Sequence, residues 1–277
     1  VTIATTGDAI DFGDLTTVKR FTSACASLTR GVWGGGETGV TTDIIDYVTI
    51  ATIGNSADFG NLQRVKRVIA GASGNGRGIV CGGHTLGSVV YSDIDYFTFS
   101  TLGDANDFGD LSGNAYACGA NSSGILGTCN IGRLNGGAYV NTIEKFTIAS
   151  PASSTDFGDL DVIRAFTANC SNGTRGTAHQ GYDHDTTTYY NTIDYITFAS
   201  PANALDFGDM AETGTIEDQG TGAPTRGVVK LGDGGTQGSN NTLEYITIAS
   251  NGNSDNFGDT SIDIGYGAGH CSDTRSV

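Results

Sequence analysis

The sequence predicts an all-β fold, a six-bladed β-propeller with four short strands in each blade. A block of 15 residues recurs six times along the 277-residue chain. Successive copies start 47, 49, 49, 50 and 50 residues apart. A period of this length with four-stranded units is typical of propeller blades. The chain also has 43 glycines and only 3 prolines, which suits many short strands joined by tight turns.

The repeated block begins in the third strand of each blade. Its copies start at Val1, Val48, Phe97, Phe146, Ile196 and Ile246. Around the fifth start, residues 191–200 (NTIDYITFAS) are rich in β-branched and aromatic residues and contain no glycine or proline. Apolar side chains fall on both faces of this strand, so we expect both faces to be covered.

The rest of each period supplies the other three strands. A turn leads from the third strand into an outer, fourth strand around the sequence D-F-G. Residues 20–27 (RFTSACAS) are typical of the first, inner strand, and residues 29–36 (TRGVWGGG) of the second. A loop that differs from repeat to repeat then returns to the next third strand.

The two ends of the chain are expected to share the last blade. Residues 261–277 would supply its two inner strands and residues 1–15 its two outer strands. Such a blade closes the ring and leaves no open sheet edge between the ends. We therefore expect a single propeller domain over residues 1–277, with five whole blades and one shared blade. The alternative is that the chain is one segment of a longer repeat-bearing protein.

The D-F-G motif is assigned a structural role. It occurs six times, with Asn256 in place of the aspartate in the last copy, and no kinase phosphate loop accompanies it. We expect each phenylalanine to wedge between blades, the glycine to permit a turn and the aspartates to accept turn hydrogen bonds. The phenylalanines are Phe12, Phe59, Phe108, Phe157, Phe207 and Phe257.

Arginines recur at the start of the second strand, in the sequence T-R-G. They are Arg30, Arg77, Arg175, Arg226 and Arg275. We expect them to form bidentate ion pairs with D-F-G-D carboxylates of the same or a neighbouring blade. The third repeat has Leu126 at this position, so its carboxylates should lack that partner.

The charge balance argues against several classes of partner. The chain has 30 acidic and 14 basic residues, a formal net charge of −16 and a pI of about 4.3. Most of the bases fall at repeat positions, so we expect no nucleic-acid partner and no attraction to an anionic membrane. The longest apolar runs have the length of strands, so we expect no membrane insertion.

No metal, cofactor or catalytic residue is assigned. The acids near the N-terminus and in residues 182–185 (YDHD) match no calcium-binding loop and are interpreted as solvated or turn-capping groups. The four histidines occupy different positions in different repeats, which argues against a shared metal site.

The six cysteines alternate with small apolar residues, so we interpret them as buried free thiols. Free thiols, with no signal-peptide pattern at the N-terminus, indicate folding in a reducing cytoplasm.

The loops between second and third strands differ most between repeats and should share one face of the disc. Their aromatic side chains are candidate binding residues, because tyrosine is a rigid amphipathic group suited to contacts with proteins or sugars. The candidates are Tyr91, Tyr139, Tyr182, His184, Tyr189 and Tyr190. The alternative is that these tyrosines only cover strand ends.

The order of features resembles the kelch repeat. An arginine heads the first strand, a glycine pair ends the second and a tyrosine lies in the third, as in Arg67, residues 82–83 and Tyr96. The third repeat departs from this pattern with Lys145 in place of the tyrosine, and phenylalanine stands where kelch repeats have tryptophan. The resemblance covers the whole chain and concerns fold, which does not imply function.

The repeated sequence also resembles kelch-like repeats in structural proteins of marine bacteriophages, cyanophages especially. The resemblance lies in N-T-I-D-Y-I-T, followed by D-F-G-D-L and T-R-G-V. The resemblance implies a non-enzymatic virion protein, either in a host-attachment tail fibre or as a capsid or tail decoration. Its partners would be other virion proteins, or a protein or glycan of the host surface. Two alternatives stay open: a carbohydrate-binding or carbohydrate-active propeller, and a passive scaffold that spaces its neighbours in an assembly.

Overall fold

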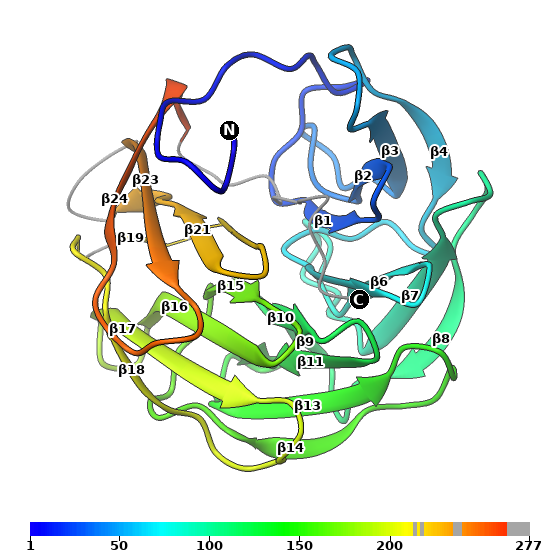
Figure 1. The fold of residues 1–277 in the computed structure, drawn as a ribbon. Helices are drawn as coiled ribbons and strands as arrows, with labels where there is room; N and C mark the ends of the chain where they lie inside the picture. The colour runs from blue at the N-terminus through cyan, green and yellow to red at the C-terminus, as the bar shows by residue number, and fades with distance from the viewer. Residues whose placement is uncertain (213–214, 217–218, 235–239, 265–277) are drawn as a thin grey trace.

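Five four-stranded antiparallel sheets stand around a common axis and form a β-propeller (Figure 1). The structure is a computed structural model that describes residues 1–212, 215–216, 219–234 and 240–264. Within these ranges the chain consists of strands, turns and loops, without a helix.

Each blade runs from an inner first strand to an outer fourth strand. Blade 1 consists of β1 (Ser23–Ala26), β2 (Arg30–Gly34), β3 (Ile44–Thr49) and β4 (Ala57–Asn61). Blade 2 consists of β5 (Ala70–Gly74), β6 (Arg77–Cys81), β7 (Asp93–Thr98) and β8 (Asn106–Asp110). Blade 3 consists of β10 (Gly119–Ser122), β11 (Leu126–Asn130), β13 (Thr142–Thr147) and β14 (Thr155–Asp159). Blade 4 consists of β15 (Ala168–Ser171), β16 (Arg175–Asp183), β17 (Thr188–Thr197) and β18 (Leu205–Asp209). Blade 5 consists of β20 (Gln219–Gly222), β21 (Arg226–Lys230), β23 (Asn240–Thr247) and β24 (Asp255–Ile264).

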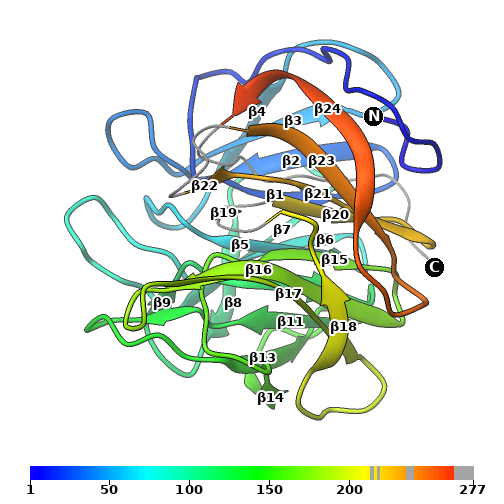
Figure 2. The same cartoon turned by 90° about the vertical axis from the view of Figure 1, so that its left-hand side faces the viewer.

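Two short antiparallel pairs lie on one face of the disc. One joins β9 (Ala115–Tyr116) to β12 (Arg133–Leu134), and the other joins β19 (Thr215–Ile216) to β22 (Asp233–Gly234). The side view shows β9, β19, β22 and the far end of the β16–β17 hairpin on the same side (Figure 2). We call this side the crown face.

The inner strands are made of small residues because neighbouring blades approach closely at the axis. A Cβ atom on Gly71 would lie 2.4 Å from the carbonyl oxygen of Ala24. The Ser122 hydroxyl donates to the carbonyl oxygen of Ser73 in the neighbouring blade at 2.6 Å. Glycine, alanine and serine in the first strands therefore let the sheets converge.

The D-F-G motif forms a β-bulge at the same step in every described blade. In blade 1, Ile45 pairs with Gly60 and Asp46 pairs with Asp58, which leaves Phe59 as the extra residue. The register shifts at the equivalent step in the other four sheets. Gly60 has a φ of 147°, a conformation that favours glycine, so the motif is a bulge signature.

The extra phenylalanine packs against the following blade. The ring centroid of Phe59 lies 5.2 Å from that of Phe97 in blade 2, and Phe108 lies 5.5 Å from Phe146 in blade 3. Phe157, Phe207 and Phe257 are also buried, whereas Phe12 is half-buried. Fully burying such a ring contributes about 1.5–3 kcal/mol, so these wedges are a repeated source of cohesion between blades.

The prediction of six blades is wrong for the part of the chain that the structure describes, which holds five. The sixth blade was expected to take its inner strands from residues 261–277. Residues 261–264 instead continue β24, and residues 265–277 lie outside the described residues. Residues 1–15 form no strand, because a strand needs a hydrogen-bonded ladder partner that the described residues do not supply.

The T-R-G arginines do not pair with D-F-G-D carboxylates, so that prediction is wrong for the four arginines that the structure describes. Arg77 donates from Nη1 to the carbonyl oxygens of Ile148 and Ala149 in the next blade, at 3.0 Å each. Its guanidinium also lies 4.6 Å from the ring centroid of Tyr96. We call this arrangement the arginine clamp.

Arg30, Arg175 and Arg226 form the same clamp over their own tyrosines. The physical reason is that the D-F-G-D carboxylates already serve their own turns. Asp107, for example, accepts the N–H of Gly109 at 3.0 Å. The carbonyls that follow the third strand are the acceptors within reach. Arg275 lies outside the described residues.

Candidate binding face

One pair of positions in each blade carries side chains that differ from blade to blade. In each pair, the residue shortly before the inner strand bridges to the residue that follows the glycine after the second strand. The pairs are Arg20–Glu37, Arg67–His84, Tyr116–Arg133, Ala165–Tyr182 and Ile216–Asp233. We call these five pairs the crown. Their backbone geometry repeats while their chemistry varies, which is the pattern of functional positions on a rigid scaffold.

A series of backbone hydrogen bonds ties the crown together around the axis. The N–H of Val68 donates to Phe21, that of Ala117 to Val68 and that of Phe166 to Ala117, at 3.0, 3.2 and 3.0 Å. These residues all have left-handed φ angles, 59° for Phe21, 55° for Val68 and Ala117, and 62° for Phe166. Such angles are costly for bulky or β-branched residues, so the surrounding contacts must fix them. The crown therefore stands on a rigid base.

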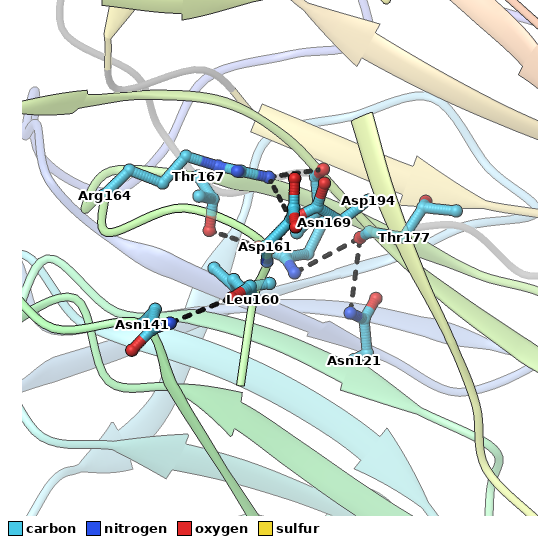
Figure 3. A network of polar contacts seen from close by, with 10 residues as sticks. Asn121, Asn141, Leu160, Asp161, Arg164, Thr167, Asn169, Thr177 and Asp194 are labelled. Carbon is cyan, nitrogen blue, oxygen red and sulfur yellow. Dashed lines mark hydrogen bonds and ion pairs between the residues drawn. The ribbon is translucent and has the colours of Figure 1, made fainter. Parts of the chain in front are cut away.

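Buried ion pairs anchor the segments that lead into the crown. Lys66 Nζ lies 3.0 Å from Asp95 Oδ2, and both side chains are fully buried. In blade 4, Arg164 Nη2 lies 3.1 Å from Asp194 Oδ2, which also accepts the N–H of Asp161 at 3.1 Å (Figure 3). Blade 1 has the same pair in Lys19 and Asp46. Each base directly precedes a crown residue, so the pair fixes where that residue sits.

Burial is the largest cause of the pKa shifts of Asp95, Asp194 and Arg164. It raises the pKa of Asp95 and Asp194 and lowers the pKa of Arg164, although each partner's charge opposes the shift. An acid and a base that neutralise each other can stay buried away from water, whereas burying either charge alone strongly destabilises the fold.

Blade 3 keeps the carboxylate but has no base opposite it. Ala115 stands where blade 2 has Lys66, and a glutamate replaces the aspartate. Glu144 accepts the N–H of Ser112 at 3.1 Å and the hydroxyls of Ser112 and Ser154. The buried carboxylate of blade 5 is satisfied in the same way, because Glu244 accepts the N–H of Ala211 and the hydroxyl of Ser254.

A continuous row of rings and one guanidinium crosses blades 2, 3 and 4 on the crown face. Starting in blade 2, the ring of His84 lies 4.4 Å from that of Tyr116. The Arg133 guanidinium lies 5.4 Å from Tyr116 and 5.2 Å from Tyr139. His184 stacks on Tyr139 at 6.3 Å. We call His84, Tyr116, Arg133, Tyr139, His184, Tyr182 and Tyr189 the ring row.

The far end of the ring row stands on the long hairpin of blade 4. Its strands β16 and β17 have 9 and 10 residues, longer than the 5 and 6 of β6 and β7. Tyr182 lies 4.6 Å from Tyr189 across the hairpin and 6.1 Å from His184. Asp183 caps the turn by accepting the N–H of Asp185 at 2.9 Å and the Thr186 hydroxyl at 2.8 Å.

The middle of the ring row carries positive charge. Burial, with the charge of Arg67, lowers the pKa of His84 to about 4, so this histidine is neutral at neutral pH. Burial raises the pKa of Tyr139, which stays a phenol. Arg133 donates from Nε to the carbonyl oxygen of Gly137 at 3.2 Å, and no carboxylate of the described residues forms an ion pair with it.

A second charged cluster lies beside the ring row in blades 1 and 2. Glu37 is buried, and its carboxylate binds Arg20 at 3.0 Å and also binds Arg67. Burial alone would raise the pKa of Glu37, but the hydrogen bonds and charges of the two arginines lower it below its usual value. Both guanidiniums also lie over the ring of Phe21, at 4.9 and 5.2 Å.

The structure brings four of the six candidate residues into the ring row: Tyr139, Tyr182, His184 and Tyr189. Tyr91 lies apart, under the guanidinium of Arg64 at 5.3 Å. Tyr190 is on the same hairpin, opposite Gly181, and has no ring contact with the row among the described residues. The four that meet do so because the second-to-third-strand loop of blade 3 and the long hairpin of blade 4 touch, through the stacked rings of Tyr139 and His184.

Sequence reasoning missed His84, Tyr116 and Arg133 as members of the ring row. A usable signal was present, because His84 and Arg133 each follow the glycine that ends a second strand. That position holds Glu37, His84, Arg133, Tyr182 and Asp233 in successive repeats. This position accepts an acidic, a basic and an aromatic residue in different repeats. Its side chains therefore have a role other than packing.

No protein-family model matches this chain, and no curated protein matches it in sequence. Within the described ranges, no helix is long and apolar enough to cross a membrane. The same ranges contain no group of three or more histidine, cysteine or acidic side chains placed to hold a metal ion. Five of the six cysteines are buried free thiols, and Cys271 lies outside the described residues.

Proposed function

We propose that this chain is a non-enzymatic binding module of a virion, which attaches the particle to a host surface or decorates it. The crown face is the proposed contact surface. The ring row is the observation that carries the proposal, because it gathers rigid aromatic side chains and an arginine on a fixed base. Tyrosine and arginine of this kind dominate binding energy at interfaces. The virion setting comes from the resemblance of the repeats.

We also propose that the ring contains a sixth, kelch-like blade shared between the two ends of the chain. Support comes from the first 15 residues. The N–H of Gly7 donates to Phe257 at 2.8 Å, and that of Gly54 donates to Phe12 at 2.9 Å. The same bond joins Gly103 to Phe59 at 2.8 Å. Arg226 clamps onto the carbonyl of Ile3 as other clamp arginines do onto the next blade. Projections along the axis by electron microscopy should show six blades, and five would refute this closure.

Antibody fragments test the virion role. Fragments raised against the crown face should label purified particles and should lower adsorption to host cells. A fragment against the opposite face, around the exposed Ile125, is the matched control. Labelling without an effect on adsorption would favour decoration or a passive scaffold over attachment, and absence of label would refute the virion role.

A further inference from the structure

Arg133 differs from the other arginines of the crown face in its charge balance. Arg20 and Arg67 share the carboxylate of Glu37, and Arg64 Nε lies 2.7 Å from Asp93 Oδ2. Arg133 donates to the carbonyl oxygen of Gly137 and forms no ion pair within the described residues. Its charge is therefore compensated by the faces of two tyrosine rings rather than by an anion.

The surroundings of Arg133 do not supply that anion. Burial lowers the pKa of His84 to about 4, so it is neutral at neutral pH, and burial raises the pKa of Tyr139, which stays a phenol. At the tip of the blade 4 hairpin, the carboxylate of Asp183 caps the turn and Asp185 is exposed, and neither forms an ion pair with Arg133. A half-buried guanidinium with open donors between two rings is a preformed receptor for a carboxylate or sulfate group.

The rest of the ring row adds a second requirement to the ligand. The ring of Tyr139 is buried, and the exposed or half-exposed rings of His184, Tyr182 and Tyr189 continue the row away from Arg133 along the hairpin. A ligand that matches both parts must be anionic and must also present apolar ring faces in series. Pyranose sugars present such faces through their C–H groups, and acidic sugars carry the anion on the same ring.

We propose that the ring row binds an acidic polysaccharide, with Arg133 gripping a carboxylate or sulfate and the aromatic rings packing against neighbouring sugar rings. This inference rests on the proposed binding function and names its ligand class. Single-stranded nucleic acid is the other anionic polymer with stacking rings. It is disfavoured because its phosphates lie along the backbone beside the stacked bases, whereas Arg133 lies within the row of rings, 5.4 and 5.2 Å from the ring centroids of Tyr116 and Tyr139.

Calorimetry with four probes tests the ligand class. The probes are oligomeric polymannuronate, dextran sulfate, neutral dextran and oligothymidylate. The wild-type chain should bind polymannuronate or dextran sulfate at least about tenfold more tightly than neutral dextran, and added salt should weaken binding. If polymannuronate binds more tightly, the preferred anion is a carboxylate. If dextran sulfate binds more tightly, the preferred anion is a sulfate. Equal affinity for neutral dextran, or tighter binding of oligothymidylate, would overturn the proposal.

Two substitutions at Arg133 and a matched control locate the site. R133M should lower affinity for the acidic glycan by about tenfold or more, and R133K should lose less because charge remains but the planar fork is lost. R64M removes one arginine from the same face outside the ring row and should change affinity less than about twofold. Equal losses in R133M and R64M would mean that general charge, rather than this site, binds the glycan.

Failure of this inference is distinguishable from failure of the binding function. If the wild-type chain binds host cells but none of the acidic glycans, the ligand class is wrong and the binding function stands. Each variant should keep the thermal midpoint of the wild type, and R133K serves as the folded reference if R133M loses stability.

Discussion

Blades 2 and 3 are neighbours with the same backbone, yet they use their cations differently. Blade 2 has Lys66 buried against Asp95 and Arg77 in a clamp over Tyr96. Blade 3 has Ala115 and Leu126 at the positions of those two bases, and Lys145 in place of the tyrosine. Lys145 lies over Phe157 instead, at 5.8 Å.

Both members of each contact have changed together in blade 3. Where the base is absent, the buried acid is a glutamate held by serines, and where the clamp arginine is absent, the tyrosine beneath it is absent too. Blade 3 also carries Tyr116, Arg133 and Tyr139, the centre of the ring row. The repeat is therefore a set of coupled pairs. Each pair can be exchanged as a unit, while the crown residues of the blade vary independently.

The largest expected effect comes from breaking a coupled pair in blade 2. K66M leaves Asp95 buried without its counter-charge and should lower the free energy of unfolding by about 3–5 kcal/mol. The equivalent change in blade 3, S112A, removes the hydrogen bond that the Ser112 hydroxyl donates to Glu144 and should cost about 1–3 kcal/mol. Urea unfolding measures both. Equal losses would mean that the ion pair has no special role.

Blade 4 has a buried histidine at a position where blade 3 has an asparagine. His179 is fully buried against Thr177 and Met210, whereas blade 3 has Asn130 at that position. Burial, with the charge of Arg164, lowers the pKa of His179 to about 3.

Between pH 6.5 and 4, the unfolded chain therefore binds a proton at His179 that the folded chain does not. The free energy of unfolding should fall as pH falls through this window, by about 1.4 kcal/mol per pH unit from this group. H179N, which imports the residue of blade 3, should flatten the dependence by that slope. A parallel profile in the variant would show that His179 is protonated in the folded state.

The arginine clamp should matter where it exists and not where it is missing. R77M removes a cation–π contact and two hydrogen bonds to the next blade, so we expect a loss of about 1–2 kcal/mol. L126M in blade 3 replaces a half-buried apolar side chain by one of similar size and should change stability by less than about 0.5 kcal/mol. Thermal unfolding of the two variants gives the comparison, which fails if both lose the same amount.

The smallest expected effect is a gain. Installing the clamp in blade 3 with L126R and K145Y should stabilise the chain more than the sum of the single changes, by about 0.5–1 kcal/mol. A double-mutant cycle measures that coupling. Additive single changes would show that arginine and tyrosine do not act as a unit.

The sequence predicted the propeller because its strands and turns are local and repeated. The glycine and phenylalanine of D-F-G recur in every repeat of the sequence, and the β-bulge explains why both recur. The partners of the T-R-G arginines could not be predicted, because their acceptors are backbone carbonyls far along the chain that leave no mark in residue types, as for Arg77 and Ile148, 71 residues apart.

The ring row was only half predictable for a similar reason. Tyr182 and Tyr189 belong to one loop that is visibly unlike the others. Tyr116 and Arg133 meet only because β9 pairs with β12 above the inner strand. Comparison of crown positions between repeats is the sequence signal that would have found Arg133 and His84.

Binding of the labelled propeller to host cells tests whether the crown face is the contact surface. The wild-type chain should bind saturably. The variant R133M/Y189S should lose most of that binding, whereas I125S, on the opposite face, should retain it. Undiminished binding by R133M/Y189S, or equal loss in I125S, would show that the crown face is not the contact surface.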